Sequence, residues 1–252
     1  MIKIVVSNDV VSRDSIAIAG FPGMGFVGKT VAEYLAKVLE AKHVASIFCT
    51  GFPAHLIVKG GGTASLVKID VYYANCNGKG IFVVTGDAQP MDDASQNELS
   101  YAIVEFLKQR GVSKVIAGAA YVTEAIVSSR RVFVAGSSNI VREFVEKVNA
   151  VPLEDGVITG MNGVIVGWAQ VEGLSAACIL GETWRSIVEL EYVDYGAAKI
   201  VLDAINAVYG LGIDTDELGR YAVEIEKEIR KRFEMFVKRE KSEGKERPYY
   251  IT

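Results

Sequence analysis

The sequence predicts an α/β protein with a mixed, mostly parallel β-sheet, and three observations lead to this fold class. Buried-strand and amphipathic-helix patterns alternate along most of the 252 residues. Residues 15–49 have the pattern strand, glycine loop, helix, strand, which is typical of the opening of a parallel sheet. Asn77-Gly78 lies between two strand-like runs and indicates a hairpin, so part of the sheet should be antiparallel.

The N-terminal half contains the first of these elements. The apolar run at 1–6 is too short for a signal peptide and predicts a strand. In 28–39, apolar residues recur at steps of three and four, which predicts a helix packed by one face. Asp92 or Asp93 should cap a second helix. The expected strands are at 1–6, 15–19, 44–49, 64–74 and 81–84, and the expected helices are at 28–39 and 92–109.

The C-terminal half continues the alternation and ends in the longest predicted helix, at 215–240. Its apolar residues form one stripe, which indicates core packing or, as an alternative, a contact with another subunit or partner. The stripe consists of Leu218, Ala222, Ile225, Ile229, Phe233 and Phe236. The other expected elements are strands at 112–118, 131–135 and 176–180 and helices at 139–148 and 195–209.

Composition indicates a single domain at 1–240 followed by a flexible tail at 241–252. Hydrophobic residues make up 50% and charged residues 23%, which allows a substantial core and excludes disorder for most of the chain. The net charge of −4 argues against a nucleic-acid partner. The lack of a long apolar run argues against a membrane partner. Cys49, Cys76 and Cys178 form no CxxC pair, so we expect reduced thiols in the cytoplasm and no disulfide framework or zinc ribbon.

The loop between the strand at 15–19 and the following helix matches two phosphate-binding motifs. Gly23-x-Gly25-x-x-Gly28 fits the dinucleotide fingerprint, and Gly23-x-x-x-x-Gly28-Lys29-Thr30 fits the Walker A pattern. Both motifs hold phosphate with backbone N–H groups at a helix N-terminus. Gly23, Gly25, Gly28, Lys29 and Thr30 are therefore the candidate cofactor-binding residues.

The residues that accompany either motif are missing elsewhere. A dinucleotide site needs an acid at the end of the second strand, where 48–53 has none. A Walker site needs an apolar strand that ends in Asp, and in the best candidate Thr-Gly separates the apolar run from Asp87. A tight strand-to-helix turn with close helix–sheet packing explains the glycines without any ligand. We therefore expect no cofactor, with a P-loop-like nucleotide-binding enzyme as the alternative.

The other chemical candidates are acids near strand ends, where α/β proteins place active sites. Asp87, Asp92 and Asp93 follow one strand, and Glu182 ends another. Asp87 and Glu182 together would suit a small-molecule hydrolase or phosphorylase, an alternative that rests on fold analogy. The sequence assigns no catalytic residue and no metal ligand. This argues against an enzyme without deciding whether the chain is one.

Four glycine-containing stretches follow one another in a specific order: FPGMGFVG at 21–28, GDAQP at 86–90, GMNG at 160–163 and LGET at 180–183. With the helical C-terminal segment, they resemble the proteasome assembly chaperone 2 family, in particular its archaeal members. The resemblance implies a three-layer α/β sandwich similar to that of nucleoside phosphorylases, without an established catalytic site. It also implies homo-oligomers that bind proteasome α subunits or a sister assembly chaperone and assist core-particle assembly without ATP.

The end of the chain provides the candidate partner-binding residues, Tyr249, Tyr250, Ile251 and Thr252. They form an aromatic tip after the polar stretch 241–247, and such a tip can serve as a docking peptide. Chaperones of the kind that the chain resembles dock by a C-terminal hydrophobic–tyrosine–any-residue ending, which enters pockets between α subunits. Tyr249-Tyr250-Ile251 has this pattern, but Thr252 follows it and displaces the carboxylate by one residue.

Overall fold

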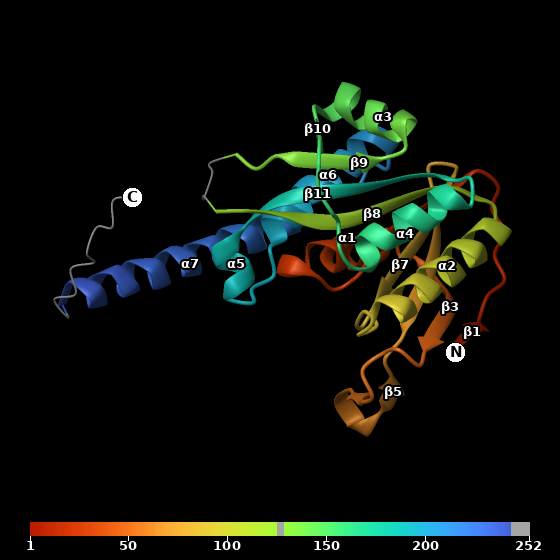
Figure 1. The fold of residues 1–252 in the computed structure, drawn as a ribbon, viewed down its shortest axis with the longest axis horizontal. Helices are drawn as coiled ribbons and strands as arrows, with labels where there is room; N and C mark the ends of the chain where they lie inside the picture. The colour runs from red at the N-terminus through yellow and green to blue at the C-terminus, as the bar shows by residue number, and fades with distance from the viewer. Residues whose placement is uncertain (125–128, 243–252) are drawn as a thin grey trace.

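The computed structural model describes residues 1–124 and 129–242, with side chains in the last helix as far as residue 231, residue 230 excepted. The chain forms three layers, with one large sheet between two sets of helices (Figure 1). The three-layer α/β sandwich that the family resemblance implies is confirmed. One face is covered by α2 (Asp93–Gln109) and α4 (Met161–Val171), and the other by α1 (Val27–Val38), α3 (Ser138–Val148) and α6 (Tyr195–Tyr209).

The sheet has nine strands, and its centre is parallel. β7, β2, β8 and β11 run parallel to one another, whereas β6, β3 and β1 extend one side, and β9 the other, by antiparallel pairing. The mixed sheet with a parallel core agrees with the predicted class. The order is β1 (Ile2–Val6), β3 (Lys42–Cys49), β6 (Ile69–Cys76), β7 (Lys79–Gly86), β2 (Ser15–Gly20), β8 (Val112–Thr123), β11 (Ser175–Trp184), β9 (Val132–Gly136) and β10 (Val151–Pro152).

The predicted hairpin joins β6 to β7. Cys76 pairs with Lys79, and the two residues between them, Asn77 and Gly78, have φ angles of 51° and 80°. Positive φ at both central positions is the type I′ geometry that Asn-Gly favours. The local sequence therefore determines the turn, and the antiparallel part of the sheet is confirmed.

The glycine loop brings α1 very close to the sheet. A Cβ placed on Gly20 would lie 1.8 Å from the carbonyl oxygen of Gly28, and one on Gly28 would lie 2.3 Å from that of Gly118. Both distances are far below van der Waals contact, so only glycine permits this packing. Behind this contact Val31 and Leu35 are fully buried in the core.

The sequence patterns miss two helices, α4 and the five-residue α5 (Arg185–Glu189). α4 packs against α2, β8 and β11 and is apolar nearly all round, so it has no polar face to mark a helical period. The predicted strand at 64–74 is also wrong as one element. β5 (Ala64–Leu66) pairs with β4 (Leu56–Val58) in a separate hairpin, because the backbone of Lys68 turns to bond with Asp87 before β6 begins.

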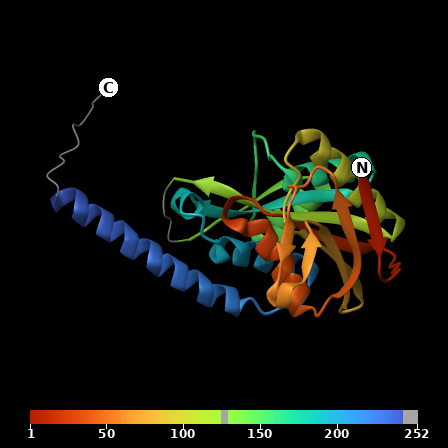
Figure 2. The same cartoon turned by 90° about the horizontal axis from the view of Figure 1, so that it is seen from below.

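The last helix, α7 (Asp216–Ser242), begins against α6 and then leaves the sandwich (Figures 1 and 2). Leu218 packs into the core beside α6, and Ile229 packs against Trp184 and Ile187. These two residues of the predicted stripe are thus core residues. The side chains of Phe233 and Phe236 lie outside the described residues.

Gly28→Ala should lower the free energy of unfolding by about 2 kcal/mol or more, because the new methyl group collides with the Gly118 carbonyl. Gly167→Ala is the matched control, since it also lies inside a helix but a Cβ there meets nothing within 4 Å. The control should be neutral or stabilising by up to about 1 kcal/mol. Urea unfolding followed by circular dichroism measures both, and equal effects would contradict the close packing.

Candidate functional site

The carboxyl end of the sheet is held together by a buried amide side chain. Asn162, at the start of α4, accepts a hydrogen bond from the backbone N–H of Phe21 (2.9 Å) and donates one to the Phe21 carbonyl (3.2 Å). It thus pairs with Phe21 as a neighbouring strand would. Asn162 is 6% exposed, and Phe21 is fully buried directly after β2. Residues 141 positions apart are therefore fixed against each other.

A second amide links the loops that follow β2 and β7. The Nε2 of Gln89 donates to the carbonyl of Pro22, and its Oε1 accepts from the backbone N–H of Met161 at 2.6 Å. A Cβ on Gly160, whose φ is +75°, would lie only 2.8 Å from this Oε1. Three of the four motifs found in the sequence, at 21–28, 86–90 and 160–163, therefore meet through side chains that bond to backbone groups.

The glycine loop uses its own amide groups internally. The N–H of Phe26 donates to Gly23 at 2.9 Å, that of Val27 donates to Met24, and that of Phe21 donates to Asn162. A phosphate cradle needs such N–H groups free to face the ligand. In the described loop, the N–H groups of these three residues are therefore not free to bind a phosphate.

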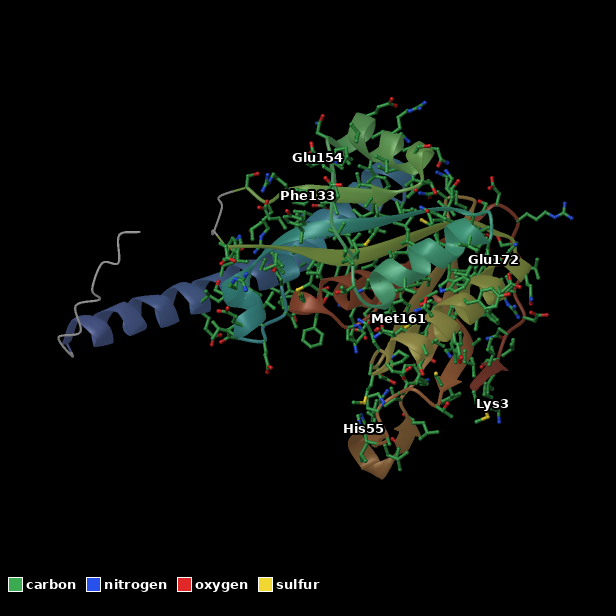
Figure 3. All side chains as sticks on the ribbon, viewed as in Figure 1. Lys3, His55, Phe133, Glu154, Met161 and Glu172 are labelled. Atoms are coloured by element: carbon green, nitrogen blue, oxygen red, sulfur yellow. The ribbon has the colours of Figure 1, made fainter. Side chains whose placement is uncertain are left out.

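Lys29 and Thr30 lie away from Gly23. They line a hollow of about 300 Å³ between α1 and α7, where the Nζ of Lys29 is 3.5 Å from a carboxylate oxygen of Glu33. Gly23 instead lines a cavity of about 680 Å³ at the carboxyl ends of β2, β7 and β8, beside the start of α4, where Figure 3 labels Met161. The structure therefore does not bring the five residues of the Walker pattern around one space.

Asp194 connects the glycine loop to the start of α6. Its backbone N–H donates to the carbonyl of Gly25 at 2.8 Å, and its Oδ1 caps the helix by accepting from Ala197 at 2.9 Å. Its Oδ2 accepts from Arg130 at 2.7 Å and from the hydroxyl of Thr183. With 2% of its surface exposed, Asp194 is completely committed to these contacts.

Arg130 carries the network onward to α7. Its guanidinium group donates to the carbonyl of Glu182 at 2.8 Å and to Glu226 on α7 at 3.1 Å, and it lies 4.1 Å from the ring of Trp184. Sequence reasoning missed Arg130 and Asp194, because lone charged residues beside loops resemble solvated surface residues. The one local signal was the position of Asp194 just before a predicted helix, where Asp is a common cap.

The acidic candidates do not form a pair. Glu182 is buried and bonds to Arg131 through both carboxylate oxygens, at 2.9 and 3.1 Å. Asp87 follows β7, which β2 and β8 separate from β11, so the two acids lie about three strand spacings, or about 14 Å, apart. Asp92 accepts from the N–H of Ser95 at 2.8 Å and caps α2, as predicted.

The described residues contain no group of three or more His, Cys, Asp or Glu side chains that could hold a metal ion. Cys49, Cys76 and Cys178 are free thiols, as expected. Among the described helices none is both long and apolar enough to cross a membrane. The predicted partner-binding residues Tyr249, Tyr250, Ile251 and Thr252 lie outside the described residues.

The fold and this site define a three-layer α/β protein whose carboxyl-end loops are locked by amide and ion-pair contacts. Residues 17–232 match the PAC2 family, and the chain belongs to this family. The resemblance inferred from the four motifs is thereby confirmed.

Solved structures and one sequence relative extend the comparison. PbaB of Pyrococcus furiosus, described as an archaeal proteasome activator, is 28% identical, with a TM-score of 0.82 over 91% of this chain and 98% of PbaB. PbaA of the same organism, described as an archaeal homolog of proteasome-assembly chaperone, is 25% identical, with a TM-score of 0.74 over 95% of each chain. An uncharacterized protein of Methanocaldococcus jannaschii is 26% identical over 87% of this chain and 83% of its own.

Asn162→Ala should lower the free energy of unfolding by about 2–4 kcal/mol, because the N–H and carbonyl of Phe21 lose their partners in a buried site. Asn139→Ala is the control, since Asn139 is exposed and, among the described residues, its side chain bonds only to Ser175. The control should change stability by less than about 0.5 kcal/mol. Chemical denaturation compares the two variants, and a small effect of Asn162→Ala would show that the contact between Asn162 and Phe21 is dispensable.

Glu182 should make stability depend on acid pH. Its bonds to Arg131 hold the pKa of the Glu182 carboxyl below its ordinary value of 4.5. A depressed folded-state pKa gives stability that is present above the ordinary value and is lost as the pH falls through the folded-state pKa. The loss of unfolding free energy in Glu182→Gln should therefore be largest near neutral pH and shrink below about pH 4.5.

The measurement is a series of urea titrations from pH 7 to about pH 3.5 on both proteins. Glu124→Gln is the control, because Glu124 also pairs with an arginine, Arg185, but is exposed. Its effect on stability should be small at every pH, because solvent screens an exposed ion pair. If the loss of unfolding free energy in Glu182→Gln stayed constant across the series, the predicted pH-dependent contribution of Glu182 would be refuted.

Proposed function

We propose that this chain is a non-enzymatic, homo-oligomeric protein that binds other proteins and assists proteasome assembly without ATP in the cytoplasm. The observation that carries the proposal is its similarity to PbaA and PbaB over almost the whole of each chain. Membership in the PAC2 family supports the same function. The partners would be proteasome α subunits or a sister assembly chaperone.

The state of the polar groups supports a protein without catalysis. Glu182, Asp194 and Asp92 each bond to groups of the protein itself. In the glycine loop, the N–H groups of Phe21, Phe26 and Val27 are likewise bonded within the protein, and Lys29 pairs with Glu33. The rival functions, a P-loop-like enzyme and a hydrolase or phosphorylase, would need these groups to be released.

The direction of α7 supports binding through the tail. Figure 2 shows α7 running away from the sandwich, so that the C-terminal end of this helix lies far from the sheet. The chain continues from there to Tyr249-Tyr250-Ile251-Thr252. Because α7 ends away from the sandwich, its end is a suitable attachment point for a docking peptide.

Calorimetry tests the nucleotide alternative. We expect no binding of Mg-ATP, GTP or NAD to the full chain at millimolar concentrations, because three N–H groups of the loop are already bonded and Lys29 and Thr30 lie away from Gly23. Lys29→Ala should leave this result unchanged. Tight binding that Lys29→Ala weakens, accompanied by turnover, would overturn the non-enzymatic proposal.

Variants of the tail test partner binding. Deletion of 248–252 should weaken co-purification with proteasome α subunits at least about tenfold, because the aromatic anchor is lost. A variant that lacks only Thr252 should bind proteasome α subunits at least as well as the natural chain, since the deletion returns the carboxylate to the position that the docking pattern requires. Replacement of 248–252 by five Gly and Ser residues controls for length. Undiminished binding after the five-residue deletion would refute tail docking.

Proteasome activation is a second candidate, favoured by the TM-score of 0.82 with PbaB. The natural chain and the tail variants described above can be used to separate the two functions. An assembly chaperone raises the yield of core particles from free subunits, whereas an activator raises peptide hydrolysis by particles already assembled.

A further inference from the structure

The cavity of about 680 Å³ at the carboxyl end of the sheet has no part in the proposed function. We propose that it binds a small organic amine, that is, a positively charged group attached to an apolar body. The proposal does not depend on binding to the proteasome.

The position of the cavity in the fold is the first argument. β2 leads into α1 on one face of the sheet, and its neighbour β7 leads into α2 on the opposite face. Where the connections of adjacent parallel strands part in this way, open α/β sheets form a ligand crevice. Gly23 and Met24 line the cavity after β2, and Gln89 and Asp93 line it after β7. Its volume is within the range of about 300–1,000 Å³ that small-molecule sites occupy.

The walls favour a ligand with an apolar body. Leu153, Ile158 and Leu180 line the cavity together with Tyr121 near the end of β8. The connection from β10 to α4 forms the outer wall as it crosses the sheet (Figure 1). An aromatic or branched aliphatic group would replace water against these side chains.

The charges of the lining determine the sign of the ligand. Asp93 and Asp155 are the charged side chains among the described lining residues, and no Lys, Arg or His joins them. Both residues are exposed at the mouth of the cavity, and within the described part of the chain neither carboxylate forms an ion pair or accepts a hydrogen bond. An amine is the group that two such carboxylates attract.

The helix ends beside the cavity do not reverse this sign. α2 and α4 both begin there, and a helix N-terminus attracts anions through its free N–H groups. However, the N–H of Ser95 in α2 donates to Asp92, and that of Met161 in α4 donates to Gln89. Each helix start therefore has one free N–H group fewer, and the full charges of the two carboxylates outweigh the partial charges that are left.

Three indoles that differ in charge test the proposal by calorimetry on the full chain. Tryptamine is a cation, tryptophol is neutral, and indole-3-acetate is an anion. We expect tryptamine to bind at least about tenfold more tightly than the other two, as a charge-assisted contact predicts. Phenethylamine and agmatine are added as amines with other bodies. Equal affinities, a preference for the anion, or no binding of any amine up to about 10 mM would overturn the proposal.

Variants locate the site. Asp93→Asn and Asp155→Asn, singly and together, should reduce the preference for tryptamine over tryptophol at least about tenfold in the double variant. Glu154→Gln is the matched control, because Glu154 is exposed in the same connection, is labelled in Figure 3 and does not line the cavity. It should keep the preference. A preference that survives in the double variant would place the binding elsewhere, and thermal unfolding of each variant without ligand confirms that it is folded.

Discussion

The contact between Asn162 and Phe21 is the constraint on which the carboxyl end of this sheet depends. One amide side chain satisfies both backbone groups of a fully buried residue, and each would cost about 1–3 kcal/mol if left unpaired. Phe21 follows the central strand β2 and Asn162 begins α4, so the contact fixes a helix of one layer to the middle of the sheet. Gln89 extends the same arrangement to the loop after β7. The glycine turn, the cavity wall and the start of α4 therefore form one unit.

A buried ion pair makes a second unit of this kind. Arg130 and Asp194 are 8% and 2% exposed in their side chains, and they join the end of β11, the start of α6 and Glu226 on α7. Burying charge is costly, and a buried pair adds little net stability compared with apolar packing. It does require one geometry, since a displaced partner would leave a charge unpaired. The angle at which α7 leaves the sandwich therefore depends on electrostatics as well as on the packing of Ile229.

Features determined by neighbouring residues could be predicted, and features determined by distant ones could not. The Asn77-Gly78 turn, the Asp92 cap and the helix at 195–209 follow from short-range patterns, and the structure has all three. α4 could not be predicted from periodicity, because it is buried between α2 and the sheet and lacks a polar face. The partners of Asn162 and Arg130 lie 141 and 64 residues away, and nothing local distinguishes these side chains from surface ones. Asn162 and Gln89 lie in two of the four motifs, but the motifs do not indicate which groups these side chains contact.

The glycine loop explains why a nucleotide-binding motif can occur without its ligand. A strand that turns directly into a helix pressed on the same sheet needs glycine at the turn and at the contact, whatever the loop binds. Phosphate sites and this loop therefore share a backbone requirement, and the difference lies in the acceptor for the N–H groups. Here the acceptors are the protein's own oxygens, from Asn162, Gly23 and Met24. With the N–H groups of Phe21, Phe26 and Val27 satisfied in this way, the loop attracts an anion less, and Asp93 and Asp155 give the space beside it the opposite preference.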